Sequence, residues 1–425
     1  MSNFNLKKFL IFILIVLLIF NETICDALNI NFLSYADELF VLILFVYSIA
    51  SILIRKTINK FSIYLLSFII LFSFVGVLSC YLNSKFNFKL VILSDFLTIK
   101  FWLLLFSFCN ISFSENTKKS FKECLESISK IVIVFALFNI LLPDLFYKLT
   151  PYTISHRFGF VCVISLFNHP GKYGWFMLFM AIYYYNEYKN TKQKKFIFNS
   201  IIFLIFSIFS FRTKVIIGAV IIVLYELIIN NKKIIKYLVP TCVILGSILF
   251  SFRNIIINTY NLYFSNSYDN KNEARVVLKK YGKKIMIDYF PLGVGFGKYG
   301  SYYAKSNYSE YYTKYGFENI YGLSKYQNNY ATDTFWPSIY AETGFIGFLL
   351  YICMLSIVYY YLRKTVHYYN SSFAILIFIQ SICESFGEPS FNSSPQYLFL
   401  AVVIGYTISA TFKKMKEKGE CYVES

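Results

Sequence analysis

Twelve apolar runs constrain the fold of this chain more than any other feature of its sequence. They lie near residues 9–20, 39–54, 61–82, 90–112, 124–146, 167–186, 196–211, 214–230, 236–252, 334–362, 371–386 and 395–412. Most are close to the roughly 17–25 residues that an α-helix needs to cross a bilayer. The sequence therefore predicts an all-α polytopic membrane protein with about twelve transmembrane helices.

The composition agrees with a membrane location. Charged residues make up only 15% of the chain and hydrophobic residues 57%, whereas about a quarter of the residues in a soluble domain are charged. The net charge of +18 is explained by basic cytoplasmic loops, so we expect no nucleic-acid partner. The nine cysteines are scattered, without a C-x-x-C pair, which signals neither a zinc site nor a disulfide framework.

The distribution of Lys and Arg predicts the orientation. The first run, 9–20, follows a basic pair as in a signal peptide, but it lacks a convincing cleavage site and is taken as a membrane helix. With the N-terminus inside, the cytoplasmic segments hold 21 Lys and Arg residues and the short external loops hold seven. The positive-inside rule then places both termini in the cytoplasm. The run at 90–112, which carries Asp95 and Lys100, is the least regular span.

One long segment interrupts the membrane helices. We divide the chain into residues 1–252 with nine helices, 253–333 as a long external loop, and 334–425 with three helices and a cytoplasmic tail. A loop of some 80 residues is too long for a simple connection, because loops of this length carry function or are disordered. Its glycines and tyrosines favour ordered structure.

The charges that could carry chemistry collect on the outer side of the predicted topology, where charges that line a membrane domain are functional candidates. They are Arg157, His169, Arg212, Lys214, Arg275, Asp333, Glu342, Glu384 and Glu388. Lysines such as Lys172 and Lys214 are more simply explained as interfacial side chains that reach headgroups. A transporter would need charges midway through its helices, and inverted repeats with paired broken helices are not evident.

Two short motifs have a structural and a functional interpretation. The segment Gly295–Gly300 fits G-x-G-x-x-G but follows a turn outside the membrane, so a nucleotide is not expected. Its glycines either give the backbone the freedom to approach another segment closely or form an ordinary glycine-rich turn. Thr332 to Thr334, followed by Pro337, are typical of a helix start. That outward helix N-terminus would favour a phosphate group. Glu342, two turns later, is more simply a partner for an arginine.

Several motifs together resemble a known family. Arg275, the run Asp288-Tyr-Phe-Pro-Leu-Gly293-Val-Gly295-Phe-Gly297, and Asp333 followed by Ala341-Glu342-x-Gly344-x-x-Gly347 are similar to the signature of the O-antigen polymerase and O-antigen ligase superfamily of bacterial envelope glycosyltransferases. Phe211-Arg212-Thr213 resembles its Ser-Arg-Thr turn. Asn168-His169-Pro170-Gly171, with Arg157 upstream, resembles its Pro-Asn-x-x-Gly segment. The resemblance covers roughly residues 150–350.

The resemblance implies the reaction and its residues. It implies a GT-C-like fold and transfer of a polyprenyl-pyrophosphate-linked glycan to an acceptor sugar at the outer membrane face, without a metal or other cofactor. Fixed arginines, which bind phosphates bidentately, could replace a metal. The pyrophosphate would bind Arg157, Arg212 and Arg275. The catalytic candidates are Asp333, Arg212 and Glu342, and the acceptor or loop candidates are His169, Gly293, Gly295 and Gly297.

One departure from the family pattern separates the possible activities. The ligases carry a His-Asn pair where this chain has Asp333-Thr334, which favours polymerisation of repeat units into an O-antigen, capsule or exopolysaccharide. A ligase and a lipid-linked oligosaccharide flippase remain the alternatives. We expect a bacterial cytoplasmic membrane protein that contacts lipid, with a chain-length regulator and a flippase as possible partners. The tyrosine-rich segment offers flat faces for sugar rings.

Overall fold

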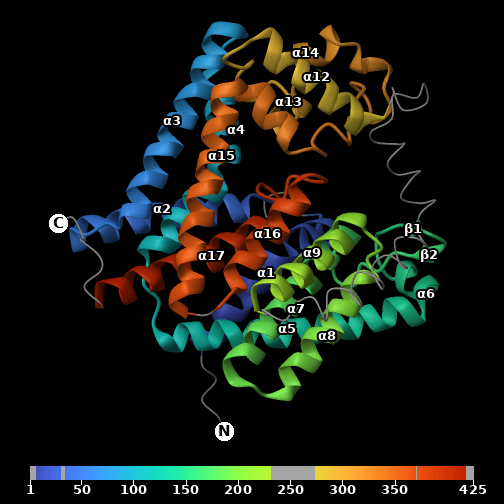
Figure 1. Cartoon of the computed structure of the whole chain (residues 1–425). Helices are drawn as coiled ribbons and strands as arrows, with labels where there is room; N and C mark the ends of the chain where they lie inside the picture. Colours follow the sequence, from blue (N-terminus) through green and yellow to red (C-terminus); the bar gives the residue numbers. More distant parts are fainter. Residues whose placement is uncertain (1–5, 30–33, 231–272, 370, 418–425) are drawn as a thin grey trace.

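The computed structural model describes residues 6–29, 34–230, 273–369 and 371–417, and about three quarters of the structure is helical (Figure 1). The longer helices are α1 (Leu6–Leu28), α2 (Ala36–Arg55), α3 (Lys60–Asn83), α4 (Phe88–Asn110), α5 (Glu115–Leu141), α7 (Pro170–Thr191), α8 (Lys194–Ile208), α9 (Thr213–Asn230), α12 (Ala274–Asp288), α15 (Trp336–Tyr369), α16 (Phe373–Ser385) and α17 (Gln396–Glu417). The short elements are α6 (Pro143–Lys148), α13 (Tyr302–Ser306), α14 (Glu310–Lys314), η3 (Phe317–Asn319), and the strands β1 (His156–Arg157) and β2 (Phe160–Val161).

Most predicted apolar runs correspond to one helix each, but the run at 124–146 is divided between α5 and α6, and the run at 236–252 lies outside the described residues. Several helices are longer than predicted. Helix α1 continues past a kink at Phe20 to Leu28. Helix α5 begins at Glu115 because the Ser114 side chain caps it by accepting a hydrogen bond from the Thr117 amide. Polar first and last turns of a membrane helix are not visible in hydropathy, so the sequence underestimates helix length.

Seven of the described helices, α1 to α5, α15 and α17, are long and apolar enough to cross a membrane. Helices α8 and α16 have only 15 and 13 residues. The prediction of a polytopic helical membrane protein is confirmed, and the count of twelve spans stays a prediction.

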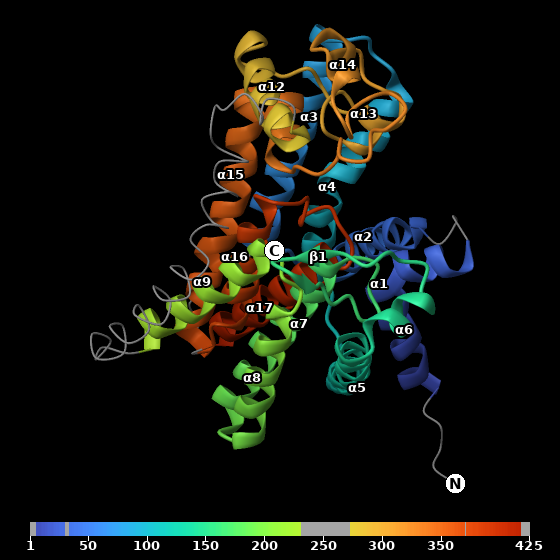
Figure 2. The same ribbon diagram turned by 90° about the vertical axis from the view of Figure 1, so that its right-hand side faces the viewer.

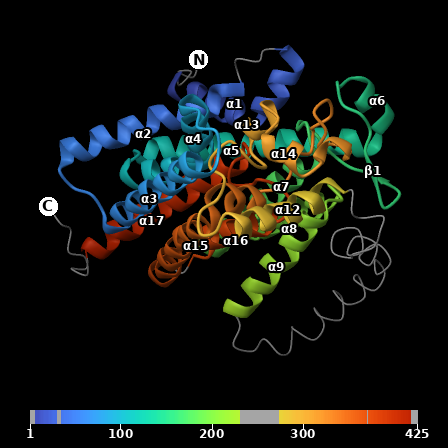
Figure 3. The same ribbon diagram turned by 90° about the horizontal axis from the view of Figure 1, so that it is seen from above.

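Loops that the charge rule assigns to one side do contact one another. On the predicted inner side Arg55 bonds Ser112 at 2.9 Å, and Lys189 bonds Ser372 at 3.2 Å. On the predicted outer side the contacts join Asn83 to Gly293, Lys298 to Lys85, Asn168 to Glu22 and Arg275 to Asp333. In Figures 1 and 3 the C-terminal end of α17 lies on one side of the molecule, and β1 and α6 lie on the other side. The two sets of loops therefore form two faces, and which face is cytoplasmic stays a prediction.

The described part of the long segment predicted to be external, residues 273–333, is folded, and we call it the outer segment. Figures 1 and 2 show α12, α13 and α14 gathered beside the ends of α3 and α4. This segment has its own hydrophobic core, separate from the large core of the helix bundle. Tyr299 and Tyr312 are fully buried in it, and Tyr312 stacks on Phe317 with ring centroids 5.1 Å apart. Packed aromatic rings, rather than connecting loop, make up the centre of this region.

A break in α15 joins this outer segment to the membrane helices. Gly344 has φ 67° and ψ −161°, which interrupts the helix. The interruption leaves the carbonyl groups of Ala341 and Glu342 to accept hydrogen bonds from the Val294 and Gly295 amides, at 2.9 and 2.8 Å. The predicted glycine turn thus replaces hydrogen bonds that a continuous helix would make internally.

Charged side chains also lie inside the bundle. Lys100, midway along α4, is 5% exposed and pairs with Asp37 at 3.1 Å and Glu38 at 2.7 Å. Tyr397 donates a hydrogen bond to Asp37 at 2.9 Å. The expectation that charges collect only on the outer side is therefore incomplete.

Candidate functional site

A tight hairpin positions Arg157. Strands β1 and β2 pair antiparallel, with Arg157 opposite Phe160. The two residues between them, Phe158 and Gly159, have φ of 56° and 83°. Two consecutive positive φ values characterise the type I′ turn, whose twist suits a two-residue hairpin.

The turn between α8 and α9 holds Arg212 against this hairpin. The Phe211 ring stacks on Phe160 with centroids 5.2 Å apart and planes 11° apart. The Val163 amide donates a hydrogen bond to the Phe209 carbonyl at 3.0 Å. Arg212 is partly buried, and its Nε atom has no hydrogen-bond partner within the described residues. A buried, unpartnered guanidinium nitrogen is costly, which favours a functional role.

Arg275 comes from the outer segment, in the first turn of α12. Its Nη2 donates to Asp333 Oδ2 at 2.9 Å, and the two side chains are 35% and 28% exposed. Helix α12 is held against α15, since the Tyr340 hydroxyl donates to the Lys279 carbonyl at 3.3 Å. Asp333 therefore lies between the tyrosine-rich segment and α15, with its carboxylate directed at an arginine.

Arg157, Arg212 and Arg275 converge, and we call these three residues the arginine site. Burial first, and then the charges of Arg157 and Arg275, lower the pKa of Arg212 below its ordinary value. Burial and Arg275 likewise lower the pKa of Lys279. Like charges held together are unfavourable until an anion arrives. The grouping of the three predicted arginines, from three separate elements, therefore creates a place that favours an anion.

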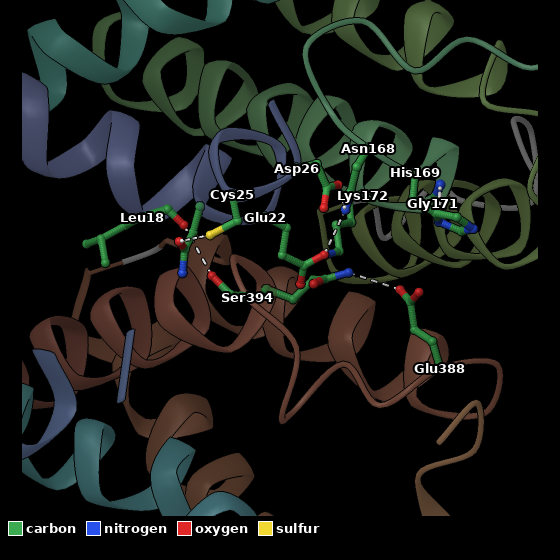
Figure 4. A network of polar contacts seen from close by, with 12 residues as sticks. Leu18, Glu22, Cys25, Asp26, Asn168, His169, Gly171, Lys172, Glu388 and Ser394 are labelled. Atoms are coloured by element: carbon green, nitrogen blue, oxygen red, sulfur yellow. Dashed lines mark hydrogen bonds and ion pairs between the residues drawn. The ribbon is translucent and has the colours of Figure 1, made fainter. Parts of the chain in front are cut away.

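Ion pairs surround the arginine site. Lys214, at the start of α9, pairs with Glu388. Lys172 pairs with Glu22, which also accepts a hydrogen bond from Asn168 at 3.0 Å. Figure 4 shows Lys172, Glu22 and Asn168 grouped together, with Glu388 to one side. The two lysines are therefore engaged within the protein, and the expectation that they simply reach headgroups is wrong.

His169 contributes a neutral imidazole to this surface. Its Nδ1 accepts a hydrogen bond from the Gly171 amide at 3.1 Å, so it caps α7 (Figure 4). His169 keeps part of its surface exposed. Desolvation by the surrounding protein atoms, and then the charges of Arg212, Lys214 and Lys172, lower its pKa well below the ordinary value, whereas Glu388 opposes the change. With Nδ1 occupied as an acceptor, the ring can present only an Nε2 hydrogen-bond donor.

The glycines serve close packing beside α15. A Cβ on Gly293 would lie 2.3 Å from the Ala341 carbonyl oxygen. A Cβ on Gly295, which has φ +90°, would lie 2.2 Å from the Cβ of Cys80 on α3. Gly297 follows in the same turn with φ +77°. These contacts support the close-approach interpretation, and they assign no acceptor contact to the glycines.

Glu342 is held by the same turn. Its Oε1 accepts hydrogen bonds from the Lys298 and Tyr299 amides, both at 2.9 Å, and from the Ser301 hydroxyl at 2.7 Å. The residue is 2% exposed. The expected arginine partner is replaced by backbone amides, because the turn folds over this carboxylate. Its geometry is that of a structural anchor.

Helix α15 begins two residues later than the apolar run predicted from the sequence. The predicted capping residues were Thr332 to Thr334, but the helix starts at Trp336 and the Phe335 carbonyl accepts the first hydrogen bonds. The predicted use of Asp333 as a cap is therefore not observed. Its carboxylate contacts Arg275 instead, since the aromatic pair Phe335 and Trp336 turns the chain into the core.

The tyrosines divide into two groups. Several form the core described above, whereas Tyr302, Tyr321, Tyr326 and Tyr330 are 55%, 73%, 94% and 41% exposed. Tyr321 and Tyr330 meet edge to face with centroids 5.9 Å apart. Only this exposed group can offer flat faces to sugar rings.

The sequence did not assign roles to Glu384 and Glu388. Both are among the charges predicted on the outer side. Their roles could not be predicted because the contacts with α9 and α17 come from distant parts of the chain. Glu388 lies in the turn between α16 and α17, where it meets Lys214 and accepts a hydrogen bond from Gln396 at 3.0 Å. Two glutamates spaced four residues apart on the outer side were the available signal.

No group of three or more metal-ligating side chains occurs among residues 6–29, 34–230, 273–369 and 371–417. Metal independence itself stays a prediction.

Part of this site lies in a segment that matches a known protein family. Residues 198–352 match the family model described as O-antigen ligase. This segment includes Arg212, Arg275, Asp333 and Glu342, and it ends within α15. A search of curated proteins found no match to the chain. The resemblance noted in the sequence is thus confirmed over this segment, which is similar to the O-antigen ligase family.

Proposed function

We propose that this protein polymerises polyprenyl-pyrophosphate-linked oligosaccharide repeat units at the outer face of the bacterial cytoplasmic membrane. The observation that carries the proposal is the convergence of three arginines beside Lys214. Of these four cations, Lys214 pairs with Glu388 and Arg275 pairs with Asp333, so Arg157 and Arg212 leave positive charge in excess. A pyrophosphate diester, which carries two negative charges, would neutralise that excess.

The reaction requires stabilisation of a leaving group more than any other contribution. An acceptor hydroxyl attacks the anomeric carbon of the donor sugar, and the bond from that carbon to the pyrophosphate oxygen breaks. Negative charge then grows on the pyrophosphate. Arginine forks held in place by the hairpin and by the turn between α8 and α9 would stabilise this charge without reorganising.

Asp333 would position the acceptor. Its carboxylate is bound to Arg275, so it lies where a sugar hydroxyl approaching a bound pyrophosphate would pass. The exposed tyrosines Tyr321 and Tyr330 are close in the sequence and would provide a stacking surface for the acceptor glycan. Glu342 and the glycines would hold this segment against α15 without touching the substrate.

A polymerase is favoured over the two alternatives. Where the resembling ligases place His-Asn, this chain has Asp333 and Thr334, and its own His169 has Nδ1 engaged with the Gly171 amide. A flippase is a less economical explanation, since an arginine site at one end of the molecule suits chemistry at a membrane surface. In this proposal both termini are cytoplasmic, about twelve helices span the membrane, and a chain-length regulator and flippase act as partners.

The test uses the purified protein in lipid nanodiscs. The donor is the lipid-linked oligosaccharide that accumulates in cells lacking this protein. We expect a ladder of lipid-linked polymer that persists in excess chelator. Transfer of polymer to lipid A core without elongation would identify a ligase. Transport of the donor without any new glycosidic bond would identify a flippase, and restoration of lost activity by magnesium would overturn metal independence.

A further inference from the structure

Unpartnered polar atoms collect at the outer end of α16, next to the arginine site. Each has almost no accessible surface and no hydrogen-bond partner in the part of the chain that the structure describes. They are Gln380 Oε1, Ser381 Oγ, Glu384 Oε2 and Gln396 Oε1. Buried polar atoms are nearly always bonded, so four such exceptions in one place require an explanation.

Hydrogen bonds and an ion pair join these residues to the proposed active site. Gln380 Nε2 donates to the Trp175 carbonyl at 3.2 Å and to Glu384 Oε1 at 3.4 Å. The Glu388 amide donates to the Glu384 carbonyl at 3.0 Å, so the two glutamates are one turn apart. Glu388 also accepts from Gln396, at 3.0 Å, and pairs with Lys214. The residues form a continuous polar path from Lys214 into the bundle.

The two glutamates differ in access. Glu384 is fully buried, whereas the Glu388 side chain is 16% exposed and meets a lysine of the site. A carboxyl group buried with one oxygen unpartnered is unfavourable unless it carries or shares a proton. An ion pair between Glu388 and Lys214 alone would explain Glu388 as structural. It would not explain a second carboxyl group and two amides left unsatisfied behind it.

We propose that Glu388 accepts the proton of the acceptor hydroxyl, with Glu384 as a positioning residue that shares this proton. This inference rests on the proposed function. As the acceptor oxygen bonds to the anomeric carbon, the bond from that carbon to the pyrophosphate oxygen breaks and its electron pair leaves with the pyrophosphate. The hydroxyl proton moves to the Glu388 carboxylate. Waters bridging the unsatisfied amide and hydroxyl atoms would complete the path.

Binding of the donor would activate this base. The groups that face the glutamates are Lys214 on α9, His169 and Lys172 at the start of α7, Arg212 before α9, Gln380 on α16 itself, and Gln396 on α17. Burial raises the pKa of Glu388, but Lys214 and the other cations outweigh it, so the group is ionised in the empty site. A bound pyrophosphate would offset the positive charges of Lys214 and Arg212. The pKa of Glu388 would then rise, which makes it a stronger base.

The experiment compares Glu388→Gln, Glu388→Asp and Glu384→Gln with Glu310→Gln. Glu310→Gln is the control because Glu310, in α14 of the outer segment, is also a glutamate paired with a lysine. Its carboxylate lies 3.7 Å from Lys298. Polymerisation of the lipid-linked oligosaccharide is followed in nanodiscs against pH. We expect Glu388→Gln to lower kcat by about 10²–10⁴-fold with little change in KM, and Glu388→Asp to retain part of the activity. Glu384→Gln should move the acidic limb of kcat upward by about one pH unit, because the shared proton that stabilises the ionised Glu388 is removed.

The outcomes separate this inference from the proposed function. A Glu388→Gln protein with the kcat of Glu310→Gln would overturn the role of Glu388. If Glu388→Gln does not fold, the decision passes to Glu384→Gln and Glu388→Asp, and unchanged pH profiles in both would reject the proton path. Wild-type protein that forms no polymer would instead remove the proposed function and, with it, this inference. If wild type polymerises the oligosaccharide and the Glu388 variants are equally active, this inference fails and the proposed function stands.

Discussion

Replacement of Arg212 by Ala should separate activity from stability. In the folded protein this guanidinium is partly buried, its Nε has no partner among the residues that the structure describes, and the charges of Arg157 and Arg275 act on it. These features oppose its charged state, so its removal relieves repulsion and a desolvation cost. We therefore expect Arg212→Ala to melt no lower than wild type. A residue that served packing alone would show the reverse.

Activity should fall because the arginine stabilises the leaving group. A hydrogen bond to a charged group contributes about 1.5–3 kcal/mol, which corresponds to a loss of roughly tenfold to 150-fold for one contact. Because charge grows on the pyrophosphate during the reaction, the loss should appear in kcat as well as in kcat/KM. Arg212→Lys should recover little activity, since an ammonium cannot make a forked contact.

The assay is elongation of the lipid-linked oligosaccharide by purified protein, together with a thermal melt of each variant. Arg55→Ala is the matched control, because Arg55 bonds Ser112 on the opposite face of the molecule. Normal elongation by Arg212→Ala would refute the pyrophosphate role. A melting temperature that falls together with activity would show that Arg212 is structural.

Three other changes test the topology, Asp333 and the glycine turn. In a cysteine-free background, Tyr326→Cys should react with a membrane-impermeant maleimide in intact cells and Asn190→Cys should not; the opposite labelling would invert the topology. If the carboxylate only orients the acceptor, Asp333→Asn should keep the elongation rate within about tenfold of wild type. A loss nearer 10²–10⁴-fold at normal protein abundance would instead make Asp333 the base and exclude Glu388 from that role. Gly293→Ala should destabilise the protein by about 1–3 kcal/mol, measured by melting, because its Cβ would lie 2.3 Å from the Ala341 carbonyl oxygen; an unchanged melt would contradict the packing described for this turn.

Much of the scaffold was predictable because each membrane helix is encoded locally. An apolar run such as 61–82 determines its own helix, α3, almost to the residue. Helix ends were less predictable where a side chain decides them, as Ser114 does for α5. The start of α15 depends instead on tertiary packing of Phe335 and Trp336, which a capping pattern cannot reveal.

The arginines could be chosen from the sequence, but their convergence could not be derived from it. The hairpin that carries Arg157 turns at Phe158 and Gly159, whereas Asn-Gly or Asp-Gly is the usual signal for such a turn. Its position depends on the stacking of Phe160 on Phe211, two aromatic residues among many. The pairing of Lys214 with Glu388 likewise joins segments that share no local pattern.

Glu342 and Arg212 illustrate how the structure distinguishes a structural charge from a functional one. Both are charged, and both lie in motifs of the same family segment. One Glu342 oxygen accepts three hydrogen bonds from a single turn, so the fold itself satisfies much of its charge and little is left for a substrate. Among the described residues the Arg212 Nε has no hydrogen-bond partner, and the charges of Arg157 and Arg275 oppose its own. A bound anion would relieve that imbalance, which is why the substrate should bind at Arg212 and not at Glu342.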